Sequence, residues 1–89
     1  MTTLRFLLTI PASLQGTYNY TIQFSVCNTT DDNEAFLEQH IAATDLAAGN
    51  IATIRDDAMP RFKSGGRREL KAHYWKGGKL VGTQDLGVV

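Results

Sequence analysis

Charge of one sign is not in excess in this sequence. Its 89 residues hold nine Lys and Arg and nine Asp and Glu, so the formal net charge at pH 7 is zero. Net charge therefore gives no reason to expect nucleic acid or an acidic membrane surface as the partner. The charges are nevertheless divided along the chain, because residues 1–54 hold one base and five acids, whereas residues 55–89 hold eight bases and four acids.

Cysteine and long apolar runs are also scarce. Cys27 is the single cysteine, which excludes a disulfide within the chain and is typical of a reducing compartment. The apolar run in residues 4–10 is far shorter than the apolar core of a secretory signal or a membrane span. We therefore predict a cytoplasmic protein without a membrane partner.

Signatures of metal, cofactor and catalytic sites are missing as well. Cys27, His40 and His73 lie far apart in the sequence and lack the paired spacing of zinc ligands. The glycine pairs at 65–66 and 77–78 lack the lysine and hydroxyl pair and the following helix of a phosphate-binding loop. We predict a non-enzymatic protein with no metal and no cofactor, and a thiol-dependent enzyme built on Cys27 is the most distant alternative.

Apolar and polar side chains alternate at strand spacing in four parts of the chain. Residues 18–27 show the cleanest alternation, which predicts a strand with one buried and one wet face. Residues 4–10 precede it and are joined to it by a loop of hairpin length. Residues 67–75 and 80–88 form a second predicted hairpin, whose turn contains two adjacent glycines.

Between the two predicted hairpins, residues 34–58 repeat apolar positions every three or four residues, as an amphipathic helix does. Thr30 or Asp31 is a suitable N-cap, and Gly49 either kinks this helix or divides it in two. A loop is expected at residues 62–66. The predicted fold class is α+β: a single domain over the whole chain, in the order ββαββ, with one kinked helix or two short helices packed on one face of a four-stranded, mainly antiparallel sheet.

Basic residues, aromatic rings and strand alternation coincide in residues 67–81. If this segment is extended, Leu70, Ala72 and Tyr74 share one face, which we predict to be core. Its opposite face and the adjoining turn form a candidate partner-binding surface. We call this surface the hairpin patch and define it as Arg67, Arg68, Lys71, His73, Trp75, Lys76 and Lys79.

The hairpin patch predicts a small binding module that engages a macromolecular partner, and an inhibitor or adaptor of phage type is one example of such a module. Tryptophan and arginine are enriched among the residues that dominate protein interfaces, so a protein partner is favoured. A nucleic-acid-binding module that uses the same patch is the main alternative, because cations neutralise phosphate and an exposed indole stacks on bases. A homodimer through an edge strand is a further alternative.

Overall fold

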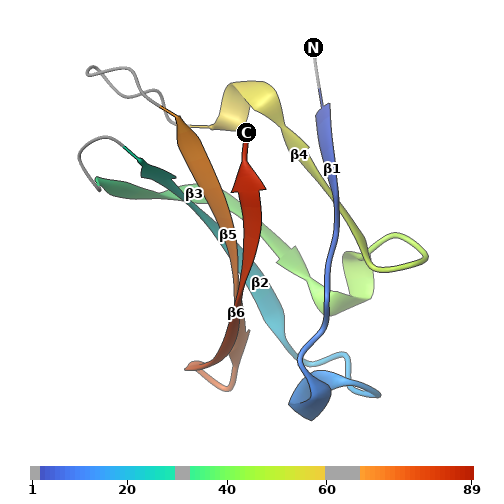
Figure 1. Ribbon diagram of the computed structural model, residues 1–89. Coiled ribbons are helices and arrows are strands. Elements are labelled where there is room, and N and C mark those ends of the chain that lie inside the picture. The colour runs from blue at the N-terminus through green and yellow to red at the C-terminus, as the bar shows by residue number, and fades with distance from the viewer. Residues whose placement is uncertain (1–2, 30–32, 60–66) are drawn as a thin grey trace.

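The computed structural model describes residues 3–29, 33–59 and 67–89, and their strands form two sheets (Figure 1). In the smaller sheet, β1 (Thr3–Leu7) pairs antiparallel with β4 (Ile51–Arg55). The larger sheet has the strand order β3-β2-β5-β6, with antiparallel neighbours throughout. Its strands are β2 (Thr21–Asn28), β3 (Glu34–Ala42), β5 (Arg68–Lys76) and β6 (Lys79–Val88).

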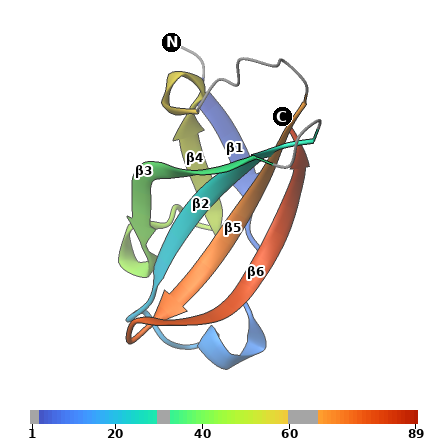
Figure 2. The same cartoon turned by 90° about the vertical axis from the view of Figure 1, so that its left-hand side faces the viewer.

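The predicted α+β class is wrong, because no α-helix occurs in the part of the chain that the structure describes. The helical elements there are 3₁₀ turns of three residues each, η1 (Ala12–Leu14), η2 (Ala43–Asp45) and η3 (Asp56–Ala58). The β1–β4 pair takes the place predicted for the helices, since it covers one face of the four-stranded sheet (Figure 2). The fold is therefore two packed layers of strands.

The apolar spacing in residues 34–58 is compatible with strands as well as with a helix. Leu37 and Ile41 stand four positions apart, which aligns them on a helix but also on one face of a strand. Strand β2 needs hydrogen-bonding partners on both edges because it is buried, and β3 pairs with the edge that β5 leaves open. This pairing decides the structure against the helical propensity of the segment.

Gly49 does not end a helix; it forms a tight turn together with Asn50. The φ angles are 80° and 60° at these two positions, and the Asn50 N–H donates to the Ala47 carbonyl at 3.1 Å. Gly49 adopts a left-handed conformation, and the turn leads into β4. The proposed caps Thr30 and Asp31 and the loop at 62–66 lie outside the described residues.

The first predicted hairpin is also wrong, because β1 pairs with β4 and not with β2. Residues 11–16 contain η1 and carry the chain from the smaller sheet to the larger one (Figure 1). A loop of hairpin length is compatible with either connection, so its length alone could not select the partner of β1.

The core lies between the two sheets and matches the predicted alternation. Leu70, Ala72 and Tyr74 are each 0% exposed, which confirms that this face of β5 is core. The other buried hydrophobic side chains include Ile22, Phe24 and Val26 from β2, Ala52 and Ile54 from β4, and Leu8, Leu14 and Leu37.

A polar contact within the structure ties the two sheets together through Gln84 of β6. Its Oε1 accepts hydrogen bonds from the Tyr74 hydroxyl at 2.9 Å and from the Thr9 backbone N–H at 2.8 Å. Its Nε2 donates to the Leu7 carbonyl at 3.4 Å. The side chain of Gln84 therefore hydrogen-bonds to the backbone at and just beyond the end of β1, at residues 7 and 9.

The second predicted hairpin is confirmed, since β5 and β6 are joined by a turn at Gly77 and Gly78. Their φ angles of 60° and 75° are the pair of positive values that a type I′ turn requires. Gly82 of β6 lies against Pro11, because a Cβ at this position would lie 2.9 Å from Cγ of Pro11.

Candidate functional site

The face of the four-stranded sheet that points away from β1 and β4, which we call the outer face, carries part of the hairpin patch. Lys71, His73 and Trp75 lie on it, because they alternate with the buried residues of β5. Arg67 is exposed just before β5. Strand alternation brings these four residues to one side of the molecule.

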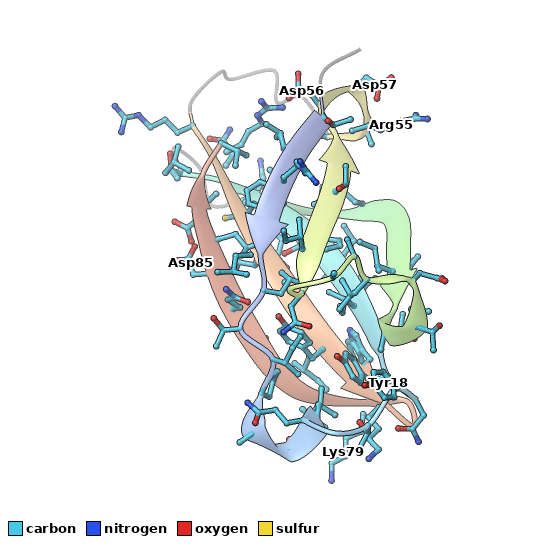
Figure 3. All side chains as sticks on the ribbon, turned by 90° about the vertical axis from the view of Figure 1, so that its right-hand side faces the viewer. Tyr18, Arg55, Asp56, Asp57, Lys79 and Asp85 are labelled. Carbon is cyan, nitrogen blue, oxygen red and sulfur yellow. The ribbon has the colours of Figure 1, made fainter. Side chains whose placement is uncertain are left out.

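Arg68, Lys76 and Lys79 are not part of the same row of side chains. Arg68 alternates toward the core side and forms an ion pair of 3.5 Å with Asp56, with 21% of its side chain exposed. Lys76 pairs with Lys79 next to the turn that ends the hairpin. Figure 3 shows Lys79 projecting from that end, at the opposite end of the molecule from Asp56. The seven patch residues therefore do not form one contiguous basic surface.

Strand β3 adds an aromatic residue to the outer face that the sequence analysis missed. Phe36 is opposite Ser25 on β2, and Ser25 is opposite Lys71 on β5, so these residues form one row across three strands. The Phe36 side chain is 51% exposed, and its ring centroid is 5.6 Å from that of His73. The predicted helix placed Phe36 in another layer of the fold, so its contact with His73 was not expected.

His73 is held at the centre of the outer face by two hydroxyl groups. Its Nε2 is 2.8 Å from Ser25 Oγ, and its Nδ1 is 3.3 Å from Thr83 Oγ1. A neutral imidazole donates at one nitrogen and accepts at the other, so both ring nitrogens can be satisfied at once. Burial lowers the pKa of His73, Glu34 opposes this with a smaller effect, and Lys71 lowers it further. The neutral form is therefore favoured at pH 7.

Acidic groups neutralise part of the basic charge of this surface. The Lys71 ammonium lies 3.8 Å from a Glu69 carboxylate oxygen, with about a third of each side chain exposed. Asp85 stands opposite Lys71 on β6. The outer face is thus mixed in charge, and this distribution is unlike the continuous cationic groove that follows a phosphate backbone.

Trp75 is only partly exposed, so it is a poorer contact residue than its position on the outer face suggests. Its indole N–H is shielded from solvent and has no hydrogen-bond partner among the described residues. Leu80 is opposite Trp75 on β6 and is 46% exposed, and Val88, at the other end of β6, is 55% exposed. On the outer face, the exposed apolar surface is therefore supplied mainly by Phe36, Leu80 and Val88.

Cys27 lies too far from His40 and His73 for its thiol to pair with an imidazole base. His40 and His73 both stand opposite Gln23, which is four residues from Cys27 along β2. At about 3.3 Å per residue, this is a separation of roughly 13 Å along the strand. Among the described residues, no group of three or more His, Cys, Asp or Glu is placed to hold a metal ion.

No family model, curated protein or solved structure matches this chain. Within residues 3–29, 33–59 and 67–89, no helix is long and apolar enough to cross a membrane.

Proposed function

We propose that this chain is a small, non-enzymatic, cytoplasmic binding module that engages a protein partner through the outer face of its four-stranded sheet. The observation that carries the proposal is the exposed apolar surface on that face. Phe36, Leu80 and Val88 are 51%, 46% and 55% exposed. Phe36 lies beside His73 at the centre of this face, and Leu80 and Val88 lie toward the two ends of β6. Apolar side chains with interspersed charges are what a protein interface needs.

Nucleic acid is the second candidate, because Arg67, Lys71 and Trp75 lie on one side of the sheet. Two observations favour protein over nucleic acid. Acidic Glu69 and Asp85 share the outer face with Lys71, and they would repel phosphate. The indole of Trp75 is partly covered, which reduces the area available for stacking on a base.

A capture experiment with matched variants tests the proposal. The tagged wild-type chain, a Phe36→Ser/Lys71→Glu variant and an Arg5→Glu/Leu7→Ser control are incubated with extract of the native cell. The control changes exposed residues of β1, where Leu7 is 70% exposed. We expect one protein to be captured by the wild type and the control but not by the outer-face variant. Equal capture by all three chains, with folding verified by circular dichroism, would contradict the assignment of the face.

A salt titration separates the two candidates. Labelled single-stranded and double-stranded DNA and RNA are titrated with the wild-type chain at about 50 mM and about 200 mM salt. Binding that weakens by a factor of 10 or more over this range would support phosphate contacts and the second candidate. We expect no detectable binding at the lower salt concentration.

A further inference from the structure

A groove on the opposite side of the molecule from the outer face has features that the proposed function does not use. It has a volume of about 420 Å³ and lies between residues 7–10, which include the last residue of β1, and residues 14–18 with Tyr20. Asn50 also lines the groove. Figure 3 shows Tyr18 in the lower part of the molecule, close to the start of β2.

Two backbone groups in the wall of this groove are without partners among the described residues. The Leu8 N–H donates to the Asn50 carbonyl at 2.9 Å, and the Thr9 N–H donates to Gln84 on the opposite edge. Successive residues of an extended chain direct their N–H and C=O groups to alternate edges. The Leu8 C=O and the Ile10 N–H therefore face the same edge as the Leu8 N–H, toward the groove, and neither forms a hydrogen bond with another described residue.

This arrangement leaves two open backbone groups just beyond the end of β1, where its pairing with β4 stops. An added strand can donate an N–H to the Leu8 carbonyl and accept the Ile10 N–H, as peptides do when they extend a sheet. Residues 8–10 span roughly 10 Å, so about three peptide residues can lie beside them.

The side chains of the groove define the chemistry of the occupant. Leu8, Leu14 and Tyr20 are 3%, 1% and 7% exposed and line its buried part. Tyr18 is 72% exposed at the rim, where its ring can cover a bound chain. None of the lining residues carries a formal charge, so a charged side chain would lose hydration without gaining an ion pair.

We propose that the groove beside residues 8–10 is a second binding site, which takes an extended, uncharged peptide segment by strand addition. The backbone groups of Leu8 and Ile10 supply the hydrogen bonds. The uncharged lining, which mixes polar and apolar residues, and the exposed ring of Tyr18 contact the side chains of the peptide. This site is separate from the outer face, and its existence does not depend on the function proposed for that face.

The test uses the full chain labelled with nitrogen-15 and a pool of acetylated, amidated tetrapeptides in which valine or isoleucine alternates with threonine or serine. We expect the amide resonances of Thr9, Ile10 and Tyr18 to shift with peptide concentration, and hydrogen exchange at Ile10 to slow. A matched pool that is N-methylated at alternate amides lacks the donors for Leu8. It should bind roughly 2- to 10-fold more weakly, the factor expected for one lost hydrogen bond.

Two variants complete the test. Tyr18→Ala removes an exposed side chain and should weaken peptide binding, whereas Phe36→Ser, on the outer face, should leave it unchanged. Absence of shifts at Ile10 up to millimolar peptide would overturn the proposal, and so would equal binding of the methylated pool. Shifts at Ile10 that grow with protein concentration in the absence of peptide would also overturn it, because the occupant would then be a second copy of the chain. None of these outcomes depends on capture of a partner by the outer face.

Discussion

Replacement of Gln84 with leucine tests the polar contact that joins the two sheets. The Gln84 side chain accepts from the Tyr74 hydroxyl at 2.9 Å and from the Thr9 N–H at 2.8 Å, and it donates to the Leu7 carbonyl at 3.4 Å. Tyr74 is 0% exposed, whereas Leu7 is 70% exposed. Water can therefore replace the lost contact at Leu7, but it cannot easily reach the hydroxyl of Tyr74.

The expected magnitudes follow from that difference in burial. Gln84→Leu leaves a buried hydroxyl without an acceptor, which should lower the free energy of unfolding by about 1–3 kcal/mol. Tyr74→Phe removes one hydrogen bond but leaves Gln84 bonded to Thr9, and should cost about 1 kcal/mol. In the double variant the unpaired hydroxyl is gone. Its cost should therefore be smaller than the sum of the single costs by about 1–2 kcal/mol.

Urea unfolding at pH 7, followed by the fluorescence of Trp75, measures these differences. Burial raises the pKa of Tyr74 to about 12, so its hydroxyl is a neutral donor throughout the experiment. With a urea dependence of about 1 kcal/mol per molar, each lost kcal/mol should move the midpoint by roughly 1 M. Costs of the two single variants that add to within ~0.5 kcal/mol would refute the coupling.

Three further predictions concern Gly82, Trp75 and His73. Gly82→Ala should lower the free energy of unfolding by about 1–3 kcal/mol in urea, because the new Cβ would lie 2.9 Å from Cγ of the rigid Pro11 ring. If Pro11→Ala in the same background restores none of this stability, the contact with Pro11 is not the cause. Trp75→Phe should change the free energy of unfolding by less than ~1 kcal/mol, because the shielded indole N–H has no partner among the described residues; circular dichroism measures it, and a loss above ~2 kcal/mol would argue against an unpaired N–H. Burial lowers the folded-state pKa of His73 below its ordinary value of 6.5, so the unfolded chain binds more protons than the folded chain between these two values. The contribution of His73 to stability should therefore be fully present above pH 6.5 and be lost as pH drops through the folded-state pKa. Urea midpoints between about pH 5 and 8 should show this slope, and His73→Gln should reduce it; an unchanged slope would assign it to other groups.

The outer face could be predicted from the sequence only in part. Lys71, His73 and Trp75 were placed together by the two-residue period of a single strand, which is a local property of the backbone. Phe36 belongs to the same surface but lies 37 positions before His73 in the sequence. Its contribution depends on the pairing of β2 with both β3 and β5, which no local pattern encodes.

Local sequence is enough to predict the alternation of β2 and β5, the core side chains of β5 and the glycine turn of the second hairpin, because each follows from spacing or φ preference within a few residues. The strand conformation of residues 34–42 and 51–55 depends instead on pairing with distant parts of the chain. An apolar spacing of four, as between Leu37 and Ile41, satisfies both a helix and a strand, so the choice depends on which backbone edges remain to be paired. For the same reason, pairing across the fold placed Phe36 beside His73 on the outer face and left the edge at Leu8 and Ile10 open.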